Sequence, residues 1–237
     1  MAERIFVQDP VSESLLKENG FTRVTLAGDG RFDNVKTIAS KEVHFPEIEG
    51  FLDGQKTIIL GSTWPEDESL IYPLIQQFPQ YKFIFAPHDI SPKHIHQISE
   101  SIPAKVLTYS ELQEHKSPKD FQVLIVDTIG MLSRLYAYAH LAIVGGGFKQ
   151  GLHNILEPLS HGVPTAYGPM THKFWEGEAA DQKGGGRIVR TTNDLREWIS
   201  WFREDLEYQK ESQKALDFIN SHSGATQKMF TEIEADR

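Results

Sequence analysis

The residues with the clearest chemical potential lie between positions 145 and 158, where a glycine-rich segment runs into a predicted helix start. The glycines let the backbone approach a ligand closely, and they are Gly145, Gly146, Gly147 and Gly151. A helix start offers unpaired backbone N–H groups at the positive end of the helix dipole, which suits a phosphate. Lys149 and His153 could add charge-assisted hydrogen bonds to such an anion.

Asn154 and Glu157 stand at the same predicted helix start. If Asn154 caps the helix, the carboxylate of Glu157 lies in the first turn, where it can accept hydrogen bonds from two ribose hydroxyls. The spacing Asn-x-x-Glu is also close to a capping box, in which both side chains serve only the helix. The segment is neither a Walker A motif nor GxGxxG, so the glycines alone leave both interpretations open.

Three further loops carry polar groups that a ligand could use. Ser62 and Thr63 follow an apolar strand and precede an acidic first helical turn, although a plain helix cap would look the same. Asp127 is followed by Thr128, Ile129 and Gly130, which could read the edge of a base or simply form a turn. Pro87 and His88 follow another strand, and His88 is equally consistent with a structural role.

The elements that must position these loops alternate strictly between strands and helices. The predicted strands cover residues 5–7, 22–27, 57–60, 81–86, 106–109, 122–126, 141–144, 163–167 and 186–189. The predicted helices cover residues 10–19, 66–78, 92–101, 130–139, 154–161, 195–202, 208–219 and 224–233, and residues 32–55 look like an irregular linker. This order predicts an α/β fold with a Rossmann-like parallel sheet and helices on both faces, whose ligands lie beyond the carboxyl ends of the strands.

The composition argues against several classes of function. The chain has 237 residues, enough for one main domain, and a formal net charge of −9, which disfavours a nucleic-acid partner. Cysteine is absent, and the ten histidines show no metal-ligand spacing, so we expect no metal and no cofactor. No apolar run approaches the roughly 20 residues of a transmembrane segment.

Several of these motifs resemble successive motifs of the bacterial Kdo (3-deoxy-D-manno-octulosonic acid) transferase family. They are the segments 61–68, 127–130 with Leu132 and Leu135-Tyr136, 145–147 with 151–158, 28–33, and 223–225. The matches span residues 5 to about 230, and the His-Asn-x-Leu-Glu-Pro stretch that begins at His153 is the most specific of them.

This resemblance implies one half of a GT-B glycosyltransferase that transfers Kdo from CMP-Kdo to lipid A precursor in lipopolysaccharide biosynthesis. Residues 1–50 would be the end of the N-terminal acceptor domain with the interdomain linker, and residues 51–237 the CMP-Kdo binding domain with its C-terminal helices. His153 and Asn154 would hold the CMP phosphate, and Glu157 the ribose. Ser62, Thr63 and the turn 128–130 would line the donor pocket.

Two departures from the family pattern matter. Many members have Pro-Arg-His where this chain has Pro87-His88-Asp89, so a permanent bidentate cation is replaced by histidine. In the family the general base is a glutamate of the N-terminal domain, which also carries the membrane anchor. We therefore expect no catalytic residue and no activity from this chain alone, and a cytoplasmic location, with the parent enzyme at the cytoplasmic face of the inner membrane.

Two other functions remain open. The chain could be part of a GT-B relative that uses a UDP-sugar, such as another transferase or a 2-epimerase. It could also be a non-catalytic nucleotide-binding module that docks on another protein.

Overall fold

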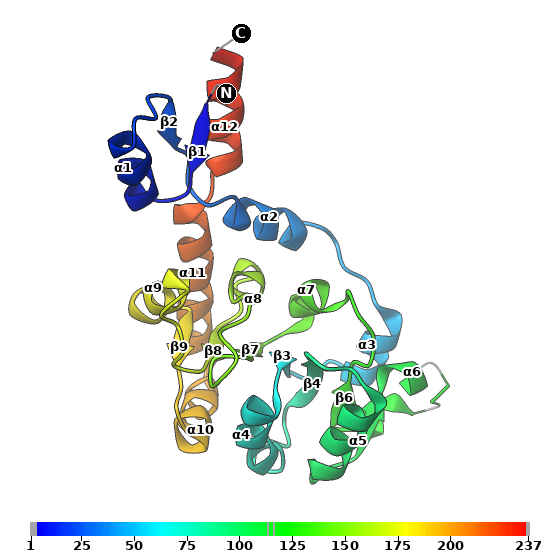
Figure 1. Cartoon of the computed structure of the whole chain (residues 1–237). Helices are drawn as coiled ribbons and strands as arrows, with labels where there is room; N and C mark the ends of the chain where they lie inside the picture. The colour runs from blue at the N-terminus through cyan, green and yellow to red at the C-terminus, as the bar shows by residue number, and fades with distance from the viewer. Residues whose placement is uncertain (1–3, 113, 116, 236–237) are drawn as a thin grey trace.

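A seven-stranded parallel sheet forms the centre of the protein in the computed structural model, which describes residues 4–112, 114–115 and 117–235 (Figure 1). The strands are β3 (Thr57–Thr63), β4 (Lys82–Pro87), β5 (Val106–Thr108), β6 (Val123–Ile125), β7 (Leu141–Val144), β8 (Thr165–Tyr167) and β9 (Gly186–Ile188). Their order is β5-β6-β4-β3-β7-β8-β9, and every neighbouring pair is parallel. The predicted fold class is confirmed.

The strand order reverses between β3 and β7. From β3 the chain first builds the sheet outward through β4, and it later returns to the other side of β3 with β7. In open parallel sheets, ligands bind at such a switch point, beyond the carboxyl ends of the two strands. The topology therefore predicts a ligand site at the loops that follow Thr63 and Val144.

Helices cover both faces of the sheet because the strand side chains alternate between two buried clusters. Ile58 and Leu60 pack in a cluster with side chains of α4, α5 and α10, whereas Ile59 packs with α3 and α7 on the other face. These helices are α3 (Pro46–Leu52), α4 (Pro65–Ile75), α5 (Pro92–Ser101), α7 (Leu132–Leu135) and α10 (Thr192–Trp201). The remaining sheet-domain helices are α6 (Tyr109–Leu112), α8 (Leu156–Ser160), α9 (Trp175–Lys183), α11 (Asp205–His222) and the 3-10 turns η1 (Pro118–Asp120) and η2 (Tyr136–Tyr138).

The expectation of an irregular linker over residues 32–55 was wrong. Helix α2 (Gly30–Ala39) starts at the cap Asp29, whose side chain accepts from the amide of Arg31, and it buries Phe32 and Val35. Pro46 opens α3 because the first helical position needs no N–H donor. Helix α9 was also not predicted, because its glycine and acidic residues leave it without an amphipathic pattern.

A smaller unit is built from both ends of the chain. Strands β1 (Ile5–Val7) and β2 (Val24–Leu26) form a separate two-stranded parallel sheet, joined by α1 (Pro10–Glu18). Helix α12 (Ala225–Ala235) lies beside β1 (Figure 1). Arg4, next to β1, forms an ion pair with Glu232 of α12. No helix within the described ranges is long and apolar enough to span a membrane.

Candidate functional site at the sheet switch point

Backbone hydrogen bonds tie together the loops that leave β3, β4 and β7. The amide of Gly145 donates to Gly61 O over 2.9 Å, and the amide of His88 donates to Thr63 O over 2.9 Å. The polar residues predicted from separate motifs thus meet at one edge of the sheet. A side chain at Gly61 would collide with Tyr136, since an added Cβ would lie 2.0 Å from its hydroxyl.

The glycine loop is folded on itself. The amides of Gly151 and His153 donate to Gly146 O and Gly145 O, at 2.8 and 3.1 Å. The amide of Gly146 donates to Asp67 Oδ2 at 2.9 Å, so it is occupied. The expectation that the amides of the glycine loop face a ligand is therefore not met at Gly146, and a protein carboxylate takes that place.

Asp67 joins α4 to the glycine loop. Its Oδ2 also accepts from the amide of Trp64 at 2.8 Å, while Oδ1 is buried without a partner among the described residues. The residue is only 3% exposed. Burial raises the pKa of Asp67 from 3.8 to about 6, although the two amide hydrogen bonds act in the opposite direction.

The start of α8 keeps two donors unpaired. No described residue accepts a hydrogen bond from the amides of Asn154 and Ile155. The Asn154 side chain accepts from the amide of Leu156 at 3.1 Å and donates to Glu157 Oε1 at 3.1 Å. Burial raises the pKa of Glu157, and no described residue binds its second carboxylate oxygen. Asn154 thus accepts from the first helical amide although the N-cap position is Ile155, so the two residues do not form a reciprocal capping box, and one oxygen of Glu157 is left as an acceptor.

Three ring side chains, those of Trp64, His88 and His153, lie against one another at this edge of the sheet. The indole N–H of Trp64 donates to His153 Nε2 at 3.1 Å. His88 stacks on Trp64, with ring centroids 4.4 Å apart, and on His153, with centroids 4.9 Å apart. Burial, and then the electrostatic interaction with the neighbouring His88, lower the pKa of His153. Trp64 was not among the predicted site residues, because no local pattern shows its contact with a residue 89 positions away.

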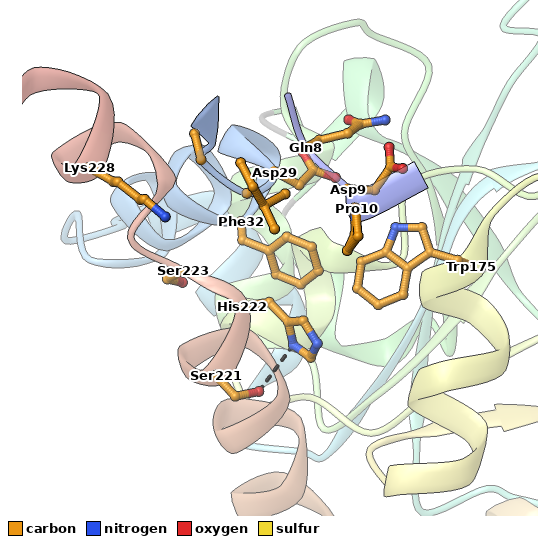
Figure 2. A pocket seen from close by; sticks show the side chains of 13 residues that line it. Gln8, Asp9, Pro10, Asp29, Phe32, Trp175, Ser221, His222, Ser223 and Lys228 are labelled. Atoms are coloured by element: carbon orange, nitrogen blue, oxygen red, sulfur yellow. Dashed lines mark hydrogen bonds between the residues drawn. The ribbon is translucent and has the colours of Figure 1, made fainter. Parts of the chain in front are cut away.

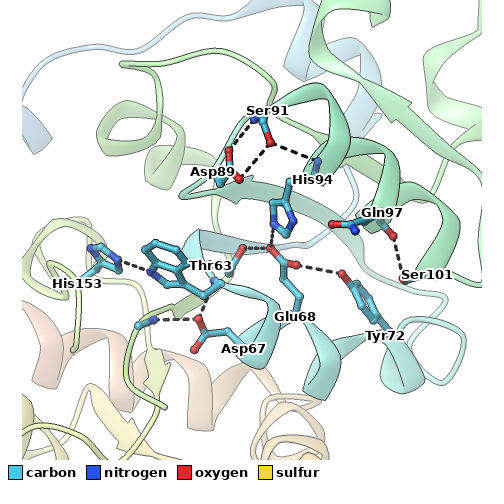
Figure 3. A network of polar contacts seen from close by, with 12 residues as sticks. Thr63, Asp67, Glu68, Tyr72, Asp89, Ser91, His94, Gln97, Ser101 and His153 are labelled. Carbon is cyan, nitrogen blue, oxygen red and sulfur yellow. Dashed lines mark hydrogen bonds and ion pairs between the residues drawn. The ribbon is translucent and has the colours of Figure 1, made fainter. Parts of the chain in front are cut away.

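Thr63 does not line the open edge, contrary to expectation. It is fully buried, and its hydroxyl donates to Glu68 Oε1 at 2.9 Å. Glu68 also binds His94 Nε2 at 3.1 Å and the Tyr72 hydroxyl at 3.1 Å, which completes a buried network (Figure 3). The cause is an irregularity in β3 at Ser62, which has a φ of 52° and reverses the alternation of side chains.

The remaining predicted residues lie around this edge with different accessibility. Ile129 projects from its loop with 86% exposure, beside exposed Thr128 and Gly130. Lys149 forms an exposed ion pair with Glu66 at 2.8 Å. The buried residues of this group are Pro87 and Gly147, and half-buried positions are Ser62 and Gly151.

A separate cavity of about 540 Å³ lies between the smaller unit and helices α9 and α11 (Figure 2). Phe32, Trp175 and His222 form its aromatic wall, and Asp9 and Lys228 contribute polar groups. None of the predicted donor-site residues lines it. Within the described ranges, no group of three or more acidic or histidine side chains is arranged to hold a metal ion.

Comparison with known proteins gives a consistent set of relatives. No protein-family model matches the chain. The 3-deoxy-D-manno-octulosonic acid transferase of Rickettsia conorii is 28% identical over 235 residues, which cover 90% of this chain and 50% of the relative. The enzyme of the same name from Aquifex aeolicus is 43% identical over 75 residues, covering 31% of this chain and 21% of the relative. The chain spans about half the length of the Rickettsia conorii relative.

Solved structures show which fold the chain has. The C-terminal CMP-Kdo binding domain of WaaA from Acinetobacter baumannii superposes with a TM-score of 0.62 at 19% identity, covering 81% of this chain and 99% of that domain. A UDP-N-acetylglucosamine 2-epimerase superposes with a TM-score of 0.60 at 18% identity, covering 90% of this chain and 52% of the epimerase chain. These likenesses confirm half of a GT-B fold.

Proposed function

Because this chain is a homologue of curated Kdo transferases over nine tenths of its length, we propose that it is the donor-binding half of a Kdo transferase. In this proposal it binds CMP-Kdo, and the other half supplies the lipid A precursor and the general base. Transfer would occur at the cytoplasmic face of the inner membrane during lipopolysaccharide biosynthesis, without a metal or cofactor.

One observation carries this proposal: the amides of Asn154 and Ile155 have no hydrogen-bond acceptor among the described residues, and they stand at the start of α8, after the loop that leaves β7 at the switch point of the sheet. Backbone donors there stabilise an anion without the need to reorganise, as the departing CMP phosphate would require. His153 lies next to them in the chain, and Lys149 adds a cation in the same loop. The free oxygen of Glu157 is the acceptor for ribose hydroxyls.

Calorimetric titration with CMP and UDP tests the donor class. We expect CMP to bind and UDP to bind more weakly, because the loop that ends in Thr128 to Gly130 must distinguish the bases. Tight UDP binding with no response to millimolar CMP would refute the assignment and favour the alternative of a UDP-sugar enzyme. If a separately expressed acceptor domain restores no transfer although CMP binds, a non-catalytic nucleotide-binding module is favoured instead.

Glu157→Gln should weaken CMP binding about tenfold, equivalent to about 1.4 kcal/mol, because a neutral amide accepts ribose hydroxyls less strongly than a carboxylate. Glutamine keeps the size of the side chain and can still accept from Asn154. Repeating the titration with deoxy-CMP gives the control, since the effect of the substitution should shrink when one hydroxyl is gone. An equal loss for both ligands would remove Glu157 from the ribose site.

A further inference from the structure

Trp64 contributes a hydrogen-bond donor to the site as well as an aromatic ring. Its indole nitrogen can only donate a hydrogen bond, and it donates to Nε2 of His153. A neutral imidazole has one N–H donor and one acceptor nitrogen, so the nitrogen that accepts from Trp64 carries no proton. The proton of His153 must then be on Nδ1.

The surroundings of His153 hold the ring in this orientation. Its Cδ2 edge faces the glycine loop, because a Cβ added to Gly146 would lie 2.9 Å from that atom. His88 stacks on the faces of both rings and restricts their rotation. No described residue binds Nδ1, which is not among the buried unpartnered atoms and therefore reaches the solvent.

We propose that Trp64 is a positioning residue that fixes His153 as the Nδ1–H tautomer, so that the imidazole presents a donor to an anionic oxygen at the site. The part of this inference that concerns a ligand rests on the proposed function, whereas the tautomer belongs to the unliganded protein. A positively charged His153 would have to give up the bond from Trp64, because two donors cannot share one hydrogen bond. Trp64 therefore favours a neutral, correctly oriented donor over a cation.

The direct test is the ¹⁵N NMR spectrum of the histidine rings in the unliganded protein at pH 7.5, with His153 assigned from the His153→Gln variant. We expect Nδ1 of His153 to be protonated and Nε2 to be unprotonated. The opposite tautomer would overturn the proposal without any need for a variant. This readout does not depend on nucleotide binding.

Trp64→Phe tests the cause of the tautomer, since it keeps an aromatic ring beside His88 but removes the N–H donor together with one of the two fused rings. We expect the population to shift toward Nε2–H and the pKa of His153 to rise, because the bond that favours the neutral form is lost. An unchanged tautomer ratio would overturn the role of Trp64. Trp201→Phe is the matched control, because Trp201 is 47% exposed on α10 and has no contact with His153.

Titration with CMP and with inorganic phosphate completes the experiment. Trp64→Phe should weaken CMP binding about tenfold, and it should add no further loss in the His153→Gln background. Additive losses would contradict an action through His153. If the tautomer behaves as expected but neither probe binds the unmodified protein, the proposed function fails while the positioning role stands.

Discussion

Gly146→Ala should destabilise the protein by roughly 2–5 kcal/mol and weaken CMP binding by about 10–100-fold. Gly146 has a φ of +85°, where a side chain costs about 1–2 kcal/mol. An added Cβ would also lie 2.2 Å from Gly151 O and 2.9 Å from His153 Cδ2, so the loop and the imidazole must move. Overpacking of this kind adds about 1–3 kcal/mol.

Urea denaturation measures the stability change, with Gly20→Ala as the matched control. Gly20 has nearly the same φ, +88°, but nothing lies within 4 Å of an added Cβ. The control should cost only the backbone part, about 1–2 kcal/mol, and leave CMP binding unchanged. Equal effects of the two substitutions on stability would show that the glycine loop is not held closely against His153.

The second large effect is a pH dependence caused by Asp67. Its pKa is raised from 3.8 to about 6, so the folded state favours the neutral carboxyl. The stability that this group contributes is fully present below pH 3.8 and is lost as the pH rises through about 6. The difference between the two values corresponds to about 3 kcal/mol.

Asp67→Asn removes this ionisation and keeps an oxygen that can accept from Gly146 and Trp64. We expect the unfolding free energy of the variant, minus that of the unmodified protein, to increase by up to about 3 kcal/mol between pH 4 and pH 7.5. Ser69→Ala on the same helix removes no ionisable group, and its difference should stay constant. A difference for Asp67→Asn that is flat or decreases with pH would show that the pKa of Asp67 is not raised in the folded protein.

Much of the fold could be predicted from local patterns. The runs 57–60 and 141–144 are apolar throughout because their strands are covered on both faces, and they became β3 and β7. Pro46 and Gly50 misled the prediction, since proline opens a helix as readily as it ends one. Helix α9 has almost no amphipathic pattern, because Gly177 and Ala180 are the small residues by which it packs closely.

The site was predictable as a location but not as a set of contacts. Polar residues after parallel strands must gather at one edge, so Ser62, His88 and Asn154 were predicted to lie near one another, and backbone hydrogen bonds do join the loops that leave β3, β4 and β7. The side chain of Thr63 points inward because Ser62, within the same strand, has a left-handed backbone conformation. Non-glycine residues rarely adopt this conformation. The bond between Asp67 and Gly146 joins positions 79 apart, and no local spacing encodes it.

The chain passes twice between the smaller unit and the sheet domain, once near Gly28 and once near Gly224. Both glycines have positive φ, and the space beside Gly28 is bounded by the Cβ of Ala225 at 3.5 Å, so the two passages touch. Asp33 links the two segments, because its carboxylate accepts hydrogen bonds from the amides of Gly224 and Thr226. Because two adjacent segments connect the smaller unit to the sheet domain, we expect the two parts to tilt relative to each other about the line through both segments. Free rotation about either single segment is prevented by the other.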